Sequence, residues 1–155
     1  MTPAIKLLIQ SGVRYDLHHF KHTTGARGYG CEAAQQLGIE QRRIFKTLLV
    51  RLESGTFAIA MVPVSGQLDL KKLAQIIGGR KVCLAKLTEV PRITGYLPGG
   101  VSPLGLKKSL RVVIDEQARL FGNIYISAGK RGVEVSLSPE TLAELTHASF
   151  HPLCR

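Results

Sequence analysis

The chain has 155 residues, 45% of them hydrophobic and 21% charged, a length and balance that predict a single folded domain over residues 1–155 and exclude a disordered chain. Lysine and arginine number 21 against 11 acidic residues, and the net charge of +10 favours a polyanionic partner such as a nucleic acid. No apolar run approaches the roughly 20 residues that span a bilayer, no secretory signal is evident, and three scattered cysteines exclude a disulfide framework, so we expect a cytoplasmic protein that binds no membrane.

Helix, strand and loop signals are mixed in the first half of the chain. Thr2 can cap a helix whose first residue is Pro3, and Gly12 ends that helix. Two β-rich runs are separated by residues 53–55, Glu-Ser-Gly, which predicts a hairpin-like connection. The elements predicted here are a helix over 3–11, a strand over 13–20, a polar loop over 21–30, a helix over 31–37, strands over 44–52 and 56–62, and a helix over 70–77 capped by Asp69.

The second half combines short strands, further helices and a loop rich in glycine and proline. Ser138 and Pro139 repeat the cap-and-proline start of a helix, which runs to about residue 145. The other predicted elements are strands over 81–84, 111–114, 123–127 and 133–137, a helix over 86–93 and a short helix over 115–120. Because strands do not alternate strictly with helices, the expected class is α+β rather than doubly wound α/β.

Residues 94–105 hold four glycines and two prolines, which excludes a regular helix or a central strand there. Glycine tolerates positive φ and lets another group approach the backbone closely. Backbone N–H groups gathered in such a loop can bind a carbonyl or phosphate oxygen. A plain surface connection between two elements is the other interpretation of this stretch taken alone.

Metal ligands and protein nucleophiles find little support in the sequence. His18, His19 and His22 lie close together, but adjacent strand residues point to opposite faces, and no Cys, His or Asp cluster completes a site. Cys31 as a nucleophile would make the protein a thiol-dependent hydrolase, yet the sequence shows no base for it. No phosphate-binding loop, dinucleotide fingerprint or metalloprotease helix is present, so we expect neither a metal nor a cofactor.

Three segments together carry a family resemblance. They are residues 45–50, in which Lys46 opens an apolar strand, residues 94–108, and residues 124–132. In this order and at this spacing, with the N-terminal Met-Thr-Pro-Ala, they resemble the YbaK family of aminoacyl-tRNA deacylases. That family is related to the editing domain inserted in bacterial prolyl-tRNA synthetases. The resemblance extends from Met1 to about residue 145.

The resemblance implies a fold and a reaction. The family fold is a single domain with a mixed, partly closed β-sheet flanked by helices. In the family reaction the thiol of misacylated Cys-tRNA(Pro) attacks its own ester carbonyl and forms a thiolactone. We therefore expect a trans-acting deacylase for Cys-tRNA(Pro), with Cys-tRNA(Cys) a further substrate, and a transient complex with prolyl-tRNA synthetase. The alternatives are a non-catalytic tRNA-binding module, or a deacylase for another small amino acid such as alanine.

The resemblance also implies roles for particular residues. The functionally central lysine of the family falls on Lys46, and the backbone of Gly99 and Gly100 would stabilise the ester carbonyl. Expected substrate contacts are Phe20, Tyr29, Thr47, Tyr96, Ser127 and Glu134. Basic residues beside the glycine-rich loops are candidates for contacts with acceptor-stem phosphates: Lys107, Lys108, Arg111, Lys130 and Arg131.

Four positions depart from the family pattern. Phe20 stands where a tyrosine is usual, and Tyr29 stands where a phenylalanine is usual. Cys31 and Glu134 each replace an aspartate. These changes leave the glycine-rich loops intact. Related subfamilies remove alanine or other residues. The resemblance therefore predicts the reaction class, deacylation of aminoacyl-tRNA, for any of these subfamilies, whereas the prediction of cysteine holds for one of them.

Overall fold

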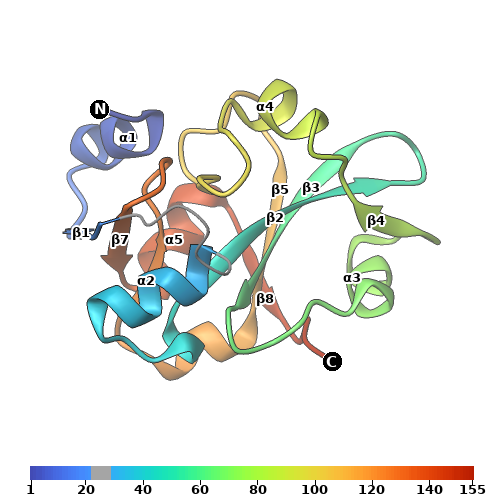
Figure 1. Cartoon of the computed structure of the whole chain (residues 1–155). Helices are drawn as coiled ribbons and strands as arrows, with labels where there is room; N and C mark the ends of the chain where they lie inside the picture. Colours follow the sequence, from blue (N-terminus) through green and yellow to red (C-terminus); the bar gives the residue numbers. More distant parts are fainter. Residues whose placement is uncertain (22–28) are drawn as a thin grey trace.

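The computed structural model describes residues 1–21 and 29–155, except for the side chain of Tyr29, and the strands within these residues form two sheets (Figure 1). A mixed sheet has the strand order β4-β2-β3-β5-β8, and an antiparallel sheet has the order β1-β7-β6. Ile44 forms an isolated bridge with Tyr125, which joins the two sheets at the start of β2. The strands are β1 (Asp16–His19), β2 (Phe45–Leu52), β3 (Phe57–Pro63), β4 (Val82–Leu84), β5 (Arg111–Asp115), β6 (Ile124–Ser127), β7 (Val133–Leu137) and β8 (Ser149–His151).

Helices flank both sheets, and their starts follow local capping signals (Figure 1). The side chains of Thr2, Asp69 and Ser138 each accept a hydrogen bond from a backbone N–H in the first turn of the helix that follows, as the sequence predicts. The helices are α1 (Pro3–Ser11), α2 (Tyr29–Leu37), α3 (Leu70–Ile77), α4 (Glu89–Thr94) and α5 (Pro139–Thr146), with 3₁₀ turns η1 (Gln41–Arg43) and η2 (Glu116–Leu120). None of the helices in the described ranges is long and apolar enough to cross a bilayer.

The mixed sheet buries apolar side chains on both faces. Along β3, Ile59 and Met61 join one core cluster, whereas Ala58, Ala60 and Val62 join a second cluster against α3. This alternation follows from the two-residue period of a strand, and the continuous apolar run follows from burial on both sides. The expected α+β class, with a mixed sheet flanked by helices, is confirmed.

Several predicted boundaries were wrong. The strand predicted over 13–20 is only β1, the helix predicted over 31–37 already begins at Tyr29, and the helix predicted over 86–93 is the shorter α4. The sequence analysis missed β8, which pairs in parallel with β5 at the edge of the mixed sheet. The predicted loop over 21–30 falls largely on residues 22–28, outside the described residues.

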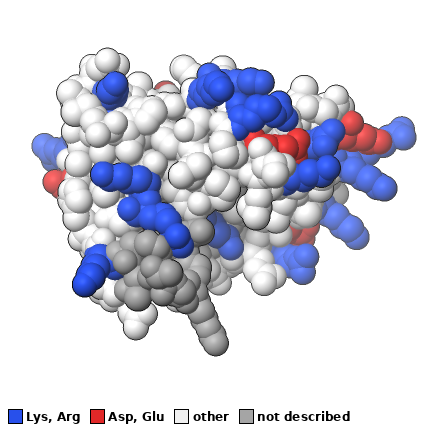
Figure 2. Space-filling model, turned by 45° about the horizontal axis from the view of Figure 1, so that its top comes forward, with Lys and Arg blue, Asp and Glu red and all other residues white. Residues whose placement is uncertain are grey.

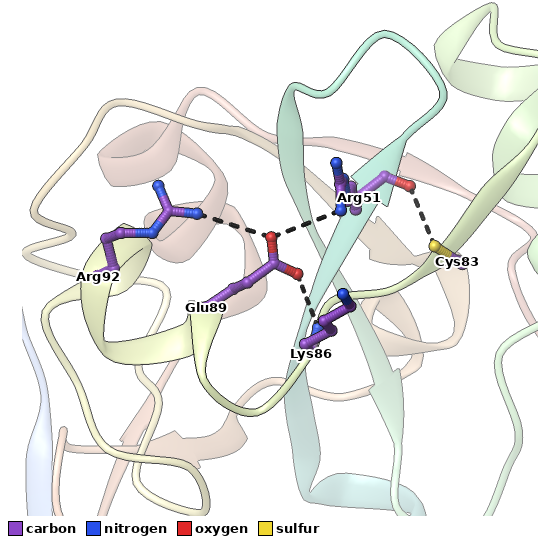
Figure 3. A network of polar contacts seen from close by, with 5 residues as sticks. All are labelled: Arg51, Cys83, Lys86, Glu89 and Arg92. Atoms are coloured by element: carbon purple, nitrogen blue, oxygen red, sulfur yellow. Dashed lines mark hydrogen bonds and ion pairs between the residues drawn. The ribbon is translucent and has the colours of Figure 1, made fainter.

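Glu89 holds the start of α4 against β2 (Figure 3). One carboxylate oxygen accepts a hydrogen bond from the backbone N–H of Lys86 at 2.9 Å, and the other lies 3.8 Å from Arg51 of β2 and 3.6 Å from Arg92. Both arginines are largely exposed, so each ion pair contributes little by itself. Together these contacts brace the helix that leads into residues 94–105, which are called the Gly/Pro loop below.

Candidate functional site

A cavity of about 380 Å³ opens where the two sheets, α2 and the Gly/Pro loop meet. Its walls are apolar at Phe20, Val64 and Val101, and polar or charged groups enter it from several elements. A volume of this size is within the range of small-molecule sites. Residues that line the cavity are Phe20, Gly30, Cys31, Glu32, Ile44, Phe45, Lys46, Thr47, Leu48, Val64, Gly99, Val101, Ser127, Lys130, Arg131, Gly132 and Glu134.

The first residues of β2 bring Lys46 and Thr47 to the cavity. Phe45, buried in the core, and the pairing of Lys46 with Val62 on β3 fix this end of the strand. The hydroxyl oxygen of Thr47 is buried and has no hydrogen-bond partner among the described residues. A buried hydroxyl without a partner is energetically unfavourable, and the residues of the fold that the structure describes do not compensate this cost.

The Gly/Pro loop contributes backbone rather than polar side chains to the cavity. Gly99 has a φ of 89°, which favours glycine, and both Gly99 and Val101 line the cavity. In the described part of the chain, the N–H groups of these two residues make no hydrogen bond. These two residues of the loop therefore combine a place in the cavity lining with an N–H that no described group engages.

Gly100 differs from the prediction made for it. Its N–H donates to the carbonyl of Leu97 at 3.0 Å, and the residue is buried outside the cavity lining. A Cβ atom at Gly100 would lie 3.0 Å from the Cα of Lys130. Gly100 therefore allows the loop to pack against the β6–β7 turn, and its N–H is already engaged within the loop.

Tyr96, a predicted substrate contact, also lies outside the cavity lining. It is 4% exposed, and its hydroxyl donates to the carbonyl of Leu104 within the loop. Burial raises the pKa of this phenol to about 12, so it keeps its proton at neutral pH. The side chain supports the shape of the loop, and its ring lies beside Gly129 of the neighbouring turn.

The antiparallel sheet brings Ser127 and Glu134 to the cavity floor. They are direct cross-strand partners on β6 and β7, so they share one face of the sheet. The Ser127 hydroxyl accepts a hydrogen bond from the N–H of Gly129 at 3.1 Å. Glu134 is 8% exposed, and burial raises the pKa of its carboxyl to about 8. Phe20, which also lines the cavity and follows β1, donates a hydrogen bond from its N–H to the carbonyl of Gly132 at 2.9 Å.

The predicted tRNA-binding residues fall into two groups. Lys130 and Arg131 line the cavity and are exposed, whereas Lys107, Lys108 and Arg111 are exposed but lie outside the lining. Figure 2 shows Lys and Arg side chains gathered in separate groups on one face, with few acidic side chains among them. Such a surface fits a phosphate-rich partner.

Several site residues were not predicted. Glu32 and Val64 enter the cavity from α2 and from the end of β3, segments whose local patterns indicate only a helix and a strand. The glycine at position 30 was the one sequence feature that could have drawn attention to this wall. In the structure a Cβ at Gly30 would overlap a methyl of Val64. Cys31 is exposed in the lining, and its sulfur accepts a 3.9 Å hydrogen bond from Gln41. The side chain of Tyr29, a predicted contact, lies outside the described residues.

Metal chemistry has no obvious ligand set in the part of the chain that the structure describes. Those residues contain no group of three or more His, Cys, Asp or Glu side chains that could hold an ion. His18 instead shares a hydrogen bond of 2.8 Å with Ser136 and contacts the ring of Tyr125, and His19 is exposed. His22 lies outside the described residues.

Comparisons with known proteins identify the family of this chain. A protein of Enterococcus faecalis named provisionally as the Cys-tRNA(Pro)/Cys-tRNA(Cys) deacylase EbsC is 37% identical over 149 residues, which cover 96% of this chain and 90% of that protein. A proline–tRNA ligase of Trichlorobacter lovleyi is 33% identical over 99 residues, 64% of this chain but only 17% of the ligase. A crystal structure provisionally described as a trans-editing enzyme for prolyl-tRNA synthetase matches with a TM-score of 0.86 at 26% identity, covering 100% of this chain and 99% of that one. The family model of the aminoacyl-tRNA editing domain matches residues 26–145, and the chain belongs to that family.

Proposed function

We propose that the protein is a trans-acting editing enzyme that removes cysteine from misacylated tRNA(Pro), with Cys-tRNA(Cys) as a further substrate. The observation that carries the proposal is the cavity, which gathers Lys46, Thr47 and the Gly99 backbone around one space large enough for an aminoacyl group. The relative from Enterococcus faecalis, 37% identical, bears the name of a deacylase for these two tRNAs. Removal of cysteine is needed because a pocket for proline discriminates poorly against a side chain of similar size.

The proposed reaction uses the nucleophile of the substrate. The cysteinyl sulfur attacks the carbonyl carbon of its own ester, and the C–S bond forms as the bond to the terminal ribose oxygen breaks. The thiol proton passes to that oxygen, so the products are tRNA with a free hydroxyl and a cysteine thiolactone, which water later opens. A thiol suits this step because a few per cent is thiolate near pH 7.

The task of the protein in this mechanism is to bind and orient. The N–H groups of Gly99 and Val101 would stabilise the negative charge that develops on the carbonyl oxygen, in place of the Gly100 N–H, which already bonds to Leu97. Lys46 would hold the terminal adenosine or the ester, and Thr47 would offer its unpartnered hydroxyl. Ser127 and Phe20 would limit the space left for the side chain, and Tyr29 would cover it.

Partners follow from the same proposal. Misacylated tRNA is the substrate, and the exposed Lys130 and Arg131 at the cavity are candidates for its phosphates. The chain matches only 17% of the length of the proline–tRNA ligase, so a transient cytoplasmic complex with the synthetase would bring deacylation to the enzyme that charges the tRNA.

The first prediction tests the reaction with matched substrates. Under single-turnover conditions the protein should cleave Cys-tRNA(Pro) much faster than Ser-tRNA(Pro) or Ala-tRNA(Pro), because neither of these carries a thiol. Lys46→Ala should slow cleavage by about 100-fold, the usual effect of losing a group that stabilises the transition state. Lys81→Ala, at an exposed position near the far end of β2, is the control and should keep full activity. Mass spectrometry should detect thiolactone before free cysteine.

Other outcomes identify the alternatives. Rapid cleavage of both seryl and alanyl esters would indicate that activated water, and not the substrate thiol, is the attacking group. Tight tRNA binding without cleavage of any ester would identify a non-catalytic tRNA-binding module. Loss of activity in Cys31→Ala would indicate a thiol-dependent hydrolase, since the proposed mechanism does not use this side chain.

A further inference from the structure

Glu134 is a buried acid that the described residues leave without a partner. Its side chain lines the cavity and the residue is 8% exposed. Within the described ranges, no hydrogen bond or ion pair joins its carboxyl to another group, and Lys46 of β2, which also lines the cavity, makes no ion pair with it. Buried carboxyl groups are otherwise paired or hydrogen-bonded in folded proteins, so its environment is incomplete without a ligand.

The neighbours of Glu134 in the sheet have other contacts. On one side its direct cross-strand partner is His18, whose ring shares a hydrogen bond with Ser136 and lies 5.1 Å from the ring of Tyr125. On the other side its partner is Ser127, whose oxygen accepts from Gly129. The carboxyl therefore lies between two polar side chains that are already engaged, on the sheet face that forms the cavity floor.

The cavity also contains a second unsatisfied polar atom, the buried hydroxyl oxygen of Thr47. Thr47 belongs to β2 and Glu134 to β7, so the two groups approach the same space from different sheets. A ligand that satisfies both must present hydrogen-bonding groups in more than one direction. At the carboxyl it must present donors or a positive charge.

We propose that Glu134 binds the free α-ammonium group of the aminoacyl ester, so that the enzyme acts on aminoacyl-tRNAs with an unmodified amino group and excludes those that are N-acylated. The proposal rests on the proposed function, because it identifies which part of the ester the carboxyl recognises. An ammonium group has three donors and a compact charge, and it is one carbon away from the carbonyl that the loop N–H groups would bind. N-acylation removes the charge and adds bulk inside a cavity of about 380 Å³.

The ionisation of Glu134 agrees with this role. Burial raises the pKa of its carboxyl to about 8, so the acid is largely neutral in the empty cavity at pH 7. An ammonium ion at the carboxyl favours the ionised form and supplies the missing charge partner. A neutral, N-acylated ligand cannot offset the cost of ionising the buried acid, so it gains nothing from this contact.

The experiment separates binding from cleavage. The probes are the amide-linked 3′-alanylamino analogue of terminal adenosine, which cannot be cleaved by the proposed reaction, and its N-acetyl form. Calorimetry at pH 7 should show that the wild-type protein binds the free amine about 10- to 100-fold more tightly, the range for a hydrogen bond to a charged group. Glu134→Gln, which keeps the shape but not the charge, should reduce this ratio to near one. Glu134→Asp should keep part of it, and Glu144→Gln, at an exposed position, should leave it unchanged.

Cleavage of Cys-tRNA(Pro) and N-acetyl-Cys-tRNA(Pro), which both keep the thiol, provides the second arm. The wild type should strongly prefer the free amine, and Glu134→Gln should lose most of this preference. Equal binding of the two analogues, or an unchanged ratio in a folded Glu134→Gln protein, overturns the proposal. If the analogues are discriminated but no Cys-tRNA is cleaved, the recognition of the amino group stands and the proposed deacylase function fails.

Discussion

Thr47 and Glu134 both line the cavity, where the Thr47 hydroxyl is buried without a hydrogen-bond partner among the described residues and the Glu134 carboxyl is largely desolvated, and both features lower the stability of the folded protein. A buried polar atom without a partner lowers the free energy of unfolding by about 1–3 kcal/mol. The remaining polar groups of the floor are satisfied locally, as the Ser127 hydroxyl is by Gly129.

A stability measurement tests the environment of Glu134. The native pKa of about 8 lies above the ordinary 4.5, so between these pH values the native state holds a proton that the unfolded chain has lost. The contribution of this group to the free energy of unfolding is therefore fully present below about pH 4.5 and is lost as pH rises toward 8, by at most about 1.4 kcal/mol per pH unit. Glu134→Gln should remove that slope, so its stability relative to wild type should improve from pH 5 to pH 8.

Urea unfolding at several pH values measures this free energy, with Glu144→Gln, at an exposed position, as the control. Parallel plots of unfolding free energy against pH for wild type and Glu134→Gln would contradict the effect of burial on Glu134.

At the scale of elements, the Gly/Pro loop is the part of the site with the most elaborate support. Thr94 bonds to the carbonyl of Val90, the Tyr96 hydroxyl bonds to Leu104, and Ser102 accepts from the N–H of Leu104. The backbone of Gly105 packs against α1 so closely that a Cβ would lie 2.6 Å from the carbonyl carbon of Pro3. The loop is thus held at both ends, which fixes the backbone that faces the cavity.

Gly100→Ala should damage the site more than the fold. The added methyl would lie 3.0 Å from the Cα of Lys130 and 3.3 Å from the nitrogen of Arg131, and backbone atoms cannot move away as a side chain can. The loop and the β6–β7 turn must separate, which should slow single-turnover deacylation by about 10- to 100-fold, because small displacements of positioning groups are costly. We expect the free energy of unfolding to fall by only about 1–2 kcal/mol.

Gly79→Ala is the matched control for this loop variant. A methyl added at Gly79 would have no atom within 4 Å, and the residue has no positive φ, so both activity and stability should stay near wild type. A Gly100→Ala protein with wild-type kinetics would mean that the contact between the loop and the turn does not position the reacting groups.

Elements with local signals could be predicted, and elements that depend on distant pairing could not. The helix starts at Thr2, Asp69 and Ser138 could be predicted because a helix cap depends on only a few adjacent residues. The strand β8 has three residues and is followed by Pro152, so only its pairing with β5 makes it a strand. The same limit explains the site: family motifs indicate Lys46, but no local pattern brings α2 and the end of β3 to the cavity.

Tyr96 shows why a family motif does not by itself specify what a side chain contacts in the fold. It belongs to the Gly/Pro segment that indicates the family, yet its ring and hydroxyl are buried within the loop. Gly100 is a similar case, because its N–H bonds to Leu97. The direction of a side chain or an N–H group depends on the folded loop, which the sequence pattern does not specify.

For the whole molecule, the excess of positive charge is the property most relevant to a tRNA substrate. The net charge of +10 gives long-range attraction to any polyanion, but productive binding needs cations near the cavity. Lys130 lies at the cavity, and Lys107 follows the Gly/Pro loop, where its N–H bonds to the carbonyl of Thr94. Arg80 and Lys81 are equally exposed but precede β4, whose residues pair with the far end of β2.

Charge reversal at Lys107, Lys108 and Lys130 should therefore weaken tRNA binding and reduce its dependence on salt, because each lost phosphate contact removes one counterion-release contribution of about 0.7–0.9 in the slope of log K against log salt. Cleavage at saturating tRNA should change less, since these side chains are not proposed to contact the ester. The matched control reverses Arg80 and Lys81, which changes the net charge of the protein but not the charge beside the cavity. Fluorescence anisotropy with tRNA(Pro) over a range of salt concentrations measures both affinity and slope.

If the two variants lose the same affinity per unit of charge changed, the attraction to tRNA is a property of the whole surface. A larger loss per charge in the first variant assigns the acceptor stem to the face that carries Lys107 and Lys130.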